Sequence, residues 1–453
     1  MTTAQQLLKK IEDNTEVVGI IGLGYVGLPL AVSFAEAGVK TLGFDKNPAK
    51  VEKINHGDNY IQDIRDAVLR EVVDKVAFSA TTDFSRMAEC DALIIAVPTP
   101  LDRFKKPDMR YIESACTDIG RYMKPGTFIC LESTTYPTTT EDFMLPIIGE
   151  NLKINPHFND ISASDSEATP KNIAPRFFLA YSPERVDPGN PSFHTRNTPK
   201  VLGAMTPEGL EIGTKLYSKA IDTIHPVSSP RVAEMVKILE NTYRLINISL
   251  INELALLAGK MDINIWEVIE AAKTKPFGFQ AFYPGPGIGG HCIPLDPFYL
   301  EHIAKKYNFD LSMIHTAGHI NMRMPHYMYI KIATALNRHK KAVNGSTVLF
   351  LGVAYKPNIN DERESPALEI MDITAHKGGN VQYHDPHIPV VQTHHGASLK
   401  SIPLTAEALA KADVVVLTTN HSAFDVDFIQ EHSQMIVDMR NMIKEAGDKV
   451  YKL

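Results

Sequence analysis

The segment VVGIIGLGYVG, residues 17–27, decides the fold of the amino-terminal part of the chain. Its first five residues are apolar and mostly β-branched, which is typical of a buried strand. They run directly into the spacing Gly22-x-Gly24-x-x-Gly27, and the residues that follow predict an amphipathic helix over 28–37. Strand, glycine loop and helix in this order indicate a Rossmann unit, in which phosphates bind at the helix N-terminus.

The strand predicted at 39–45 supplies the acid that this fold requires. Asp45 ends that strand, about 20 residues after the glycines. A carboxylate there bonds the ribose hydroxyls and repels a 2′-phosphate, so we predict NAD rather than NADP. The alternative, a glycine turn without a ligand, does not account for the strands and the helix around it. The residues of the loop expected to contact the cofactor are Gly22, Gly24, Tyr25, Val26 and Gly27.

Three further apolar runs, 91–97, 128–134 and 177–184, predict strands of the same sheet. Ligands of open parallel sheets bind beyond the carboxyl ends of the strands, so polar residues at these ends should face one crevice. Each of them alone could be an ordinary polar residue at a strand end. The polar stretch 152–175 reads as a surface insertion. The strand-end residues are Pro98, Thr99, Thr134 and Glu184.

Composition narrows the class of protein. The chain has 453 residues, a net charge of −7 and 44% hydrophobic residues, so we expect two or three domains and no nucleic-acid partner. No apolar run reaches the length of a membrane span, and the polar first residues do not form a signal peptide. The four cysteines form no CxxC pair, so we expect no metal site and a reduced, cytoplasmic protein.

The middle of the chain predicts one long helix, from about residue 229 to 260. Apolar residues recur there at helical spacing over much of the surface, which is typical of a helix buried between domains or subunits. Lys237 and Asn241 lie four residues apart and therefore on one face. A lysine on such a face either reaches solvent with its end or has a function.

The last third of the chain repeats an α/β pattern. Strands are expected at 346–354, 381–385, 413–419 and 434–440, with helices at 322–341 and 366–376. This half has no complete GxGxxG, so it should bind a nucleotide rather than a dinucleotide. A polar cluster follows its first strand, and its arginine fork suits phosphates, although an exposed charged loop is the alternative. The cluster contains Lys356, Asp361, Arg363, Glu364 and Ser365.

The loop Gly289-Gly290-His291-Cys292-Ile293-Pro294-Leu295-Asp296 places one cysteine behind a double glycine and four residues before a carboxylate. Glycines let the backbone approach a ligand closely. A thiol presented in this way, in a chain with a dinucleotide motif, indicates covalent redox chemistry, with a buried structural cysteine as the alternative.

Together these motifs resemble the UDP-glucose/GDP-mannose dehydrogenase family over essentially the whole chain. The resemblance rests on the glycine loop, Ser133-Thr134, Pro183-Glu184-Arg185, Lys237-x-x-x-Asn241, the Cys292 loop, and Lys356 through Ser365. Within the family, TKPFGF at 274–279, YPGPG at 283–287 and His291 are most similar to bacterial UDP-N-acetylglucosamine 6-dehydrogenases of surface-polysaccharide pathways.

The resemblance implies an α/β fold with two Rossmann-like, doubly wound parallel-sheet domains joined by a long-helix central domain. We place these at 1–212 for NAD, 213–325 for the helical dimerisation and active-site domain, and 326–453 for the UDP-sugar. The long helix would form the interface of a homodimer or a larger homo-oligomer.

The implied reaction oxidises the C6 hydroxymethyl of a UDP-sugar to a carboxylate in two NAD-dependent steps through a Cys292 thioester. The implied catalytic residues are Cys292, Lys237, Asn241, Asp296, Glu184 and Thr134. The implied cofactor residues beyond the glycine loop are Asp45, Pro98, Thr99, Thr134 and Arg363. The implied substrate residues are Glu184, Arg185, Lys237, Asn241, Phe277, Tyr283, Gly289, Gly290, Lys356 and Arg440.

Several alternatives stay open on sequence alone. UDP-N-acetylglucosamine is favoured by likeness, and UDP-glucose, UDP-N-acetylgalactosamine and UDP-N-acetylmannosamine remain candidates. A hydroxyacid dehydrogenase would share the Rossmann domain and the helical lysine, but it would lack the cysteine loop and the second nucleotide domain. A regulatory protein that only binds NAD would be expected to have lost one of the site residues, and none is missing.

Overall fold

The structure is a computed structural model that describes residues 1–453 except 62–63, 101–106, 159–175, 188–189, 191, 291–292, 394–395, 397 and 446. Its described residues form two compact units, Met1–Glu240 and Asn241–Leu453. We call them the amino-terminal and the carboxy-terminal unit. The division into three domains stays a prediction. His291, Cys292 and most of the predicted insertion lie outside the described residues.

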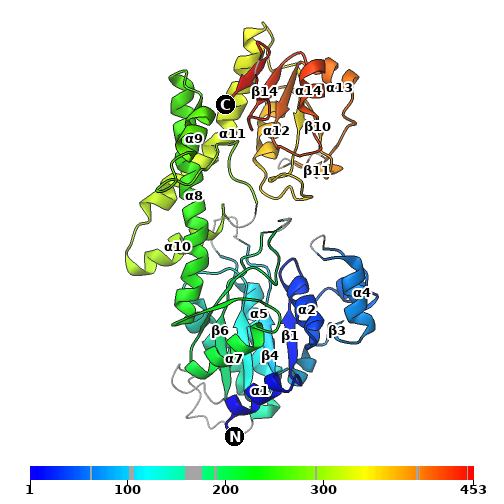
Figure 1. Ribbon diagram of the computed structural model, residues 1–453, viewed down its shortest axis with the longest axis vertical. Helices are drawn as coiled ribbons and strands as arrows, with labels where there is room; N and C mark the ends of the chain where they lie inside the picture. Colours follow the sequence, from blue (N-terminus) through cyan, green and yellow to red (C-terminus); the bar gives the residue numbers. More distant parts are fainter. Residues whose placement is uncertain are drawn as a thin grey trace. The chain divides into compact units, whose positions relative to one another are not determined.

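The amino-terminal unit is built on one eight-stranded sheet with the strand order β3-β2-β1-β4-β5-β6-β7-β8 (Figure 1). The chain leaves β1 toward β2 and β3 and then returns to β4 on its other side, so the switch point lies between β1 and β4. Neighbouring strands are parallel except β6 and β7. The strands are β1 Val17–Ile21, β2 Lys40–Phe44, β3 Phe78–Thr81, β4 Ala92–Ile95, β5 Thr127–Leu131, β6 Phe177–Tyr181, β7 Lys200–Ala204 and β8 Ile224–Val227.

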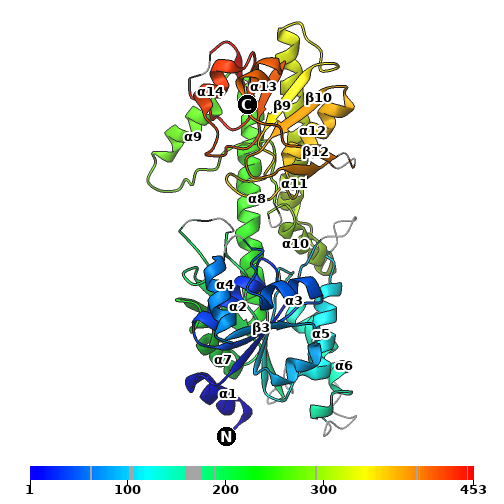
Figure 2. The same ribbon diagram turned by 90° about the vertical axis from the view of Figure 1, so that its right-hand side faces the viewer.

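Helices cover both faces of this sheet, and Figure 2 shows α5 and α6 on the side opposite α7. One buried cluster joins Phe34 of α2 and Leu216 of α7 to one face, and a second joins Ile119 of α5 and Ile148 of α6 to the other. The helices are α1 Thr3–Glu12, α2 Gly27–Glu36, α3 Pro48–Asn55, α4 Asp66–Asp74, α5 Arg110–Tyr122, α6 Leu145–Leu152 and α7 Pro207–Tyr217.

Helix α8, Pro230–Lys260, is the long helix predicted from the sequence. It ends before Asp262, which has a positive φ of 57°. Asn264 then caps α9, Ile265–Lys273, by accepting hydrogen bonds from two amides of its first turn. None of the helices formed by the described residues has the length and apolar character needed to cross a bilayer.

The carboxy-terminal unit contains a parallel five-stranded sheet with the order β10-β9-β13-β14-β15, coloured yellow to red in Figure 1. This is a doubly wound order with its switch point between β9 and β13. The strands are β9 Thr347–Leu351, β10 Asn380–His384, β13 Val414–Leu417, β14 Ile436–Asp438 and β15 Val450–Lys452, and an antiparallel pair is formed by β11 Val390–Gln392 and β12 Ser398–Lys400.

Helices again cover both faces. Met328 of α11 and Ile370 of α12 join one buried cluster, while Leu409 of α13 and Ile429 of α14 join the other. The helices of this unit after α9 are α10 Asp296–Ala304, α11 Ser312–Arg338, α12 Pro366–His376, α13 Ala406–Lys411 and α14 Val426–His432, of which the last four pack on the sheet. The predicted α/β class and both Rossmann-like sheets are therefore confirmed.

The prediction was wrong at the start of one helix. Helix α11 begins at Ser312, whereas the sequence pattern suggested a start at Met322. Its first turns are rich in polar residues, which hides the periodicity, but Ile314 and Ala317 are buried against Leu245 of α8. Tertiary packing rather than local pattern therefore sets this boundary.

Candidate active site

The glycine loop after β1 has the shape that a dinucleotide requires. Gly22 has a φ of 91°, and its amide donates to the carbonyl of Phe44 at 2.8 Å. A Cβ at Gly27 would lie 1.9 Å from the Gly22 carbonyl oxygen, so a side chain cannot fit there. A Cβ at Gly24 would have no described atom within 4 Å. Gly27 is therefore required by packing within the loop, whereas open space lies beside Gly24, where a pyrophosphate could approach.

Asp45 lies next to this loop. One carboxylate oxygen accepts from the amide of Leu23 at 3.1 Å and the other from the amide of Asn47 at 2.9 Å. Tyr60 donates to the Leu23 carbonyl at 2.5 Å, and burial raises the pKa of this phenol. A carboxylate has about four acceptor sites, so the carboxylate of Asp45 still has acceptor capacity for ribose hydroxyls. The loop and the acid fit NAD.

The predicted strand-end residues lie beyond β4 and β5. Pro98 and Thr99 follow β4, and Thr134 is half-buried beyond β5. The Ser133 hydroxyl donates to the carbonyl of Val97 at 2.8 Å and so ties the two strand ends together. These residues share the carboxyl edge of the sheet, where a cofactor would bind.

Glu184 and Lys237 are in contact. The Lys237 ammonium donates to the Glu184 backbone carbonyl at 2.7 Å. One Glu184 carboxylate oxygen accepts from the amides of Arg185 and Val186 at 2.8 and 2.6 Å, which fixes the side chain. Arg185 in turn donates to Glu240 at 2.6 Å. The predicted lysine therefore has a partner, and the structure brings it to the Pro183-Glu184-Arg185 motif.

Sequence reasoning missed a buried charge network behind Glu184. The Lys200 ammonium lies 2.9 Å from a carboxylate oxygen of Glu132 and 3.9 Å from one of Glu184. Tyr217 donates to the other Glu132 oxygen at 2.6 Å. Burial acts to lower the pKa of Lys200, but the two carboxylates outweigh it and raise that pKa. The only sign of this network in the sequence was the position of Glu132, directly after an apolar strand.

Glu234 was also missed. It is fully buried in α8, and its carboxylate accepts from the amides of Thr138 and Thr140 at 2.6 and 2.9 Å and from the Thr140 hydroxyl at 2.7 Å. Burial raises the pKa of Glu234 to about 7 against these hydrogen bonds. Glu234 anchors the turn that follows Thr134, one helical turn before Lys237.

In the carboxy-terminal unit, Asn241 and Asp296 form a second buried pair. The Asn241 amide donates to an Asp296 carboxylate oxygen at 2.5 Å, and the two residues are 4% and 3% exposed. Asp296 is the first residue of α10. Four residues before it stands Cys292, which lies outside the described residues.

The glycines before the cysteine pack against the polar segment that follows β9. A Cβ at Gly289 or Gly290 would come within 2.7 Å of Tyr355. The half-buried Lys356 is next in sequence, while Arg363 makes a two-point contact with Asp361 at 2.9 and 2.6 Å. The double glycine is required here by close contact with Tyr355, whereas the sequence suggested close approach to a ligand, which stays a prediction.

A cavity of about 730 Å³ lies beside the loop 283–287, which has the sequence YPGPG. Trp266 and Tyr283 stack in its wall with ring centroids 6.0 Å apart. The Arg440 guanidinium donates to the Thr418 carbonyl at 2.8 Å, and burial lowers its pKa to about 10. Phe277 is 72% exposed. The polar lining includes Asn420, Arg440, Asn441, Lys444 and Lys452.

These features agree with comparisons to known proteins. The NAD binding domain of the UDP-glucose/GDP-mannose dehydrogenase family matches residues 16–221, its central domain matches 231–323, and its UDP binding domain matches 349–445. The chain belongs to this family. It is an NAD-dependent UDP-sugar dehydrogenase.

Similar proteins differ in the sugar that their names specify. The chain is 32% identical to UDP-N-acetyl-D-glucosamine 6-dehydrogenase of Pseudomonas aeruginosa over 90% of this chain and 91% of that one. It is 34% identical to UDP-N-acetyl-D-mannosamine dehydrogenase of Escherichia coli K12, over 94% and 98%. A solved structure of UDP-D-ManNAc dehydrogenase from Pyrococcus horikoshii superposes with a TM-score of 0.83 at 30% identity, covering 96% and 98%.

Proposed function

We propose that this dehydrogenase oxidises the C6 hydroxymethyl of UDP-N-acetylglucosamine to a carboxylate, in two steps of two electrons each, for surface-polysaccharide synthesis. The observation that carries the proposal is the placement of reactive groups on α8. Lys237 contacts the segment of Glu184, and Asn241, one turn further along the helix, contacts Asp296. A cation and an amide on one helix face suit the stabilisation of a developing oxyanion.

The first step removes a proton and a hydride from the alcohol. In the proposed route, Asp296 and Lys237 with a water accept the hydroxyl proton, and Lys237 and Asn241 stabilise the alkoxide. Bound NAD supplies the hydride acceptor in each step. We assign Gly22, Gly24, Tyr25, Val26, Gly27, Asp45, Pro98, Thr99, Thr134 and Arg363 to cofactor binding.

The second step is covalent. Cys292 adds its sulfur to the aldehyde carbon, loss of a second hydride gives a thioester, and water releases the acid and regenerates the thiol. Glu184 or Asp296 is the proposed base for that water. A lysine ammonium near a cysteine lowers the pKa of the thiol and so increases the fraction that is present as thiolate. In total the alcohol loses four electrons to two NAD molecules.

The UDP portion is assigned to the carboxy-terminal unit. The cavity beside Tyr283 combines stacked aromatic side chains with the positive charge of Arg440, Lys444 and Lys452, which suits a base and a diphosphate. We further assign Arg185, Phe277, Gly289, Gly290 and Lys356 to the substrate.

An N-acetylated sugar is supported by the names of similar proteins, which specify glucosamine, mannosamine and galactosaminuronic acid derivatives. The choice of UDP-N-acetylglucosamine among them rests on the loops 274–279 and 283–287 and on His291. A homodimer is proposed through the exposed apolar face of α8.

The test is the yield of NADH per sugar at limiting UDP-N-acetylglucosamine, UDP-N-acetylmannosamine, UDP-N-acetylgalactosamine or UDP-glucose. Two NADH from the first sugar, with little from the others, is the expected result. Two NADH from another sugar would overturn the substrate, and one NADH would overturn the double oxidation. Cys292→Ala should abolish acid formation, and an unchanged rate in that variant would contradict the thioester.

A further inference from the structure

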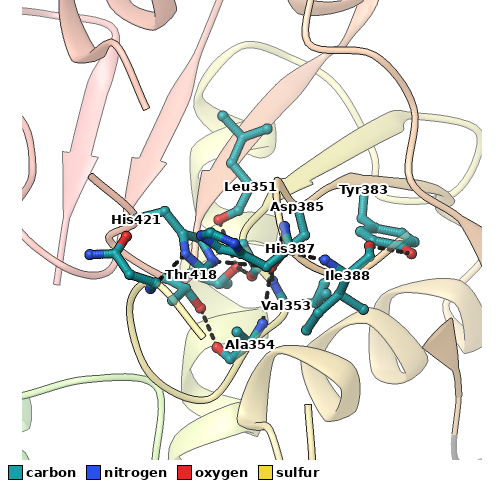
Figure 3. Close-up of polar contacts among 12 residues, drawn as sticks. Leu351, Val353, Ala354, Tyr383, Asp385, His387, Ile388, Thr418 and His421 are labelled. Atoms are coloured by element: carbon teal, nitrogen blue, oxygen red, sulfur yellow. Dashed lines mark hydrogen bonds and ion pairs between the residues drawn. The ribbon is translucent and has the colours of Figure 1, made fainter. Parts of the chain in front are cut away.

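A buried acid–histidine pair lies in the carboxy-terminal unit, outside the residues given roles above. Asp385 directly follows β10, and His421 lies four residues beyond the end of β13. Both side chains are fully buried, and Nε2 of the imidazole lies 3.1 Å from a carboxylate oxygen of Asp385 (Figure 3). A buried carboxylate and its imidazole partner need a full set of hydrogen-bond partners, and these partners indicate what the pair does.

The carboxylate of Asp385 accepts four backbone hydrogen bonds in addition to the one from the imidazole. One oxygen accepts from the amides of Val353 and Ala354 at 2.7 and 3.1 Å, and the other from those of His387 and Ile388 at 2.8 and 3.1 Å (Figure 3). Burial acts to raise the pKa of this acid, but the hydrogen bonds lower it to about 2. The acceptor sites of the Asp385 carboxylate are therefore all taken by donors of the protein, and none is left for a ribose hydroxyl.

The hydrogen bonds of His421 define its tautomer. The backbone amide of Asn358 donates to Nδ1 at 3.0 Å. Because a backbone amide can only donate, Nδ1 carries no proton, and Nε2 carries the one that is donated to Asp385. The side-chain oxygen of Asn358 also accepts from the amide and hydroxyl of Ser422 at 2.9 and 3.0 Å.

Asp385 and His421 therefore form hydrogen bonds with both ends of one segment, residues 352–358. Two threonines beyond β13 add to this, because Thr418 donates to the Gly352 carbonyl at 2.5 Å and Thr419 to the Ala354 carbonyl at 2.6 Å. The 352–358 segment is therefore fixed by side chains from two strand ends.

The middle of the 352–358 segment contacts the glycine turn that precedes Cys292 in the sequence. Tyr355 packs on Gly289 and Gly290, the glycines that precede the cysteine, so closely that neither position could carry a Cβ without movement. Lys356 follows Tyr355 directly. A shift of this segment would move both the lysine and the support of the glycine turn.

We infer that Asp385 and His421 are positioning residues for the UDP-sugar side of the site. They hold the 352–358 segment, and through it Lys356 and the turn at Gly289 and Gly290. The inference rests on the proposed function for its catalytic consequence, but the positioning itself can be measured without turnover.

The experiment compares His421→Phe with His421→Asn in the full chain. Phenylalanine fills the space but offers no acceptor, whereas the asparagine oxygen can take the place of Nδ1 and accept from Asn358. For His421→Phe we expect at least tenfold faster hydrogen exchange of the amides at 353–356 and 358 and at least tenfold weaker binding of UDP by calorimetry. Binding of NAD should be unchanged, and His421→Asn should restore exchange and UDP affinity to within about threefold of wild type.

His384→Phe is the matched control, because the imidazole of this last residue of β10 bonds the Ile402 carbonyl at 2.7 Å, outside the 352–358 segment. Unchanged exchange in His421→Phe, equal defects in the phenylalanine and asparagine variants, or a parallel loss of NAD affinity would each overturn the inference. If the wild type binds UDP and NAD but forms no acid, the proposed function fails while the positioning result stands.

Discussion

A Cβ would clash at Gly27 but not at Gly24, so alanine at the two positions should have different effects. At Gly27 it should lower stability, and at Gly24 it should weaken the binding of NAD. Alanine at Gly27 would force its Cβ to 1.9 Å from the Gly22 carbonyl oxygen, whereas the Cβ of alanine at Gly24 enters open space. We expect Gly27→Ala to lower the free energy of unfolding by about 2 kcal/mol or more. Gly24→Ala should leave stability within about 1 kcal/mol and raise the KM for NAD about tenfold. Urea unfolding and steady-state kinetics test both, and equal stability of the two variants would contradict the packing role of Gly27.

The protonation of Glu234 should make stability depend on pH. Its pKa is raised from 4.5 in the unfolded chain to about 7 in the fold, so the folded state binds one more proton between these values. The stabilising contribution is complete below about pH 4.5 and is lost as the pH rises through 7, by on the order of 3 kcal/mol.

Glu234→Gln removes this group, so the stability difference between wild type and variant should fall by that amount from pH 4.5 to pH 7.5. Denaturant unfolding at several pH values measures it. Glu150→Gln, at an exposed position of α6, is the control. A difference that stays constant with pH for Glu234→Gln would refute the assignment.

The residues that could be predicted are those whose role is local. Gly22, Gly24, Gly27 and Asp45 act within one strand-loop-helix-strand unit, so their spacing alone reveals them. Glu132, Lys200, Glu234 and His421 were not predicted because their partners lie 36 to 96 residues away in the chain. Only the fold brings such residues together.

At the level of elements, the sequence predicted the strands at the two switch points and the helices α2, α8, α11 and α12, since these have strong apolar patterns. It did not predict that β7 runs antiparallel to β6, because strand direction is set by the connection between strands rather than by their composition. It also placed the start of α11 too late, because exposed polar residues and the small Ala317 and Gly318 interrupt the apolar periodicity of its first turns.

Glu132, after β5, and Lys200, at the start of β7, form a buried ion pair. The loss of one partner should lower the free energy of unfolding strongly, because the other charge is then left buried without its partner. Glu132→Gln leaves the buried Lys200 without its carboxylate at 2.9 Å while keeping an acceptor for Tyr217. We expect a loss of about 3–5 kcal/mol in the free energy of unfolding. Replacing both partners by methionine should recover most of it, and a double-mutant cycle measures the coupling. Additive losses would show that the pair is not coupled.

At the level of the whole molecule, the sequence indicated two nucleotide-binding sheets and a long helix, and all three are present. The order of the two sheets and the long helix along the chain could be predicted, because each sheet is formed by its own continuous run of strands and turns. The partner of α8 could not, since an apolar helix pattern does not distinguish a domain interface from a subunit interface.

The apolar face of α8 should therefore decide the oligomeric state. Exposed large side chains recur along it at intervals of three, four or seven residues, from Val232 to Met261. A stripe of this length on a solvent-exposed surface indicates an interface, and we expect a second copy of the chain to cover it. Leu257 is 53% exposed in this stripe, so Leu257→Arg should raise the dimer dissociation constant at least tenfold, since full burial of a leucine contributes about 1.5–3 kcal/mol and about half of that remains to be gained in each copy. Val390→Arg, at a position 44% exposed on β11, should not change it. Sedimentation velocity over a range of concentrations distinguishes the outcomes, and a Leu257→Arg variant that remains dimeric would exclude this face as the interface.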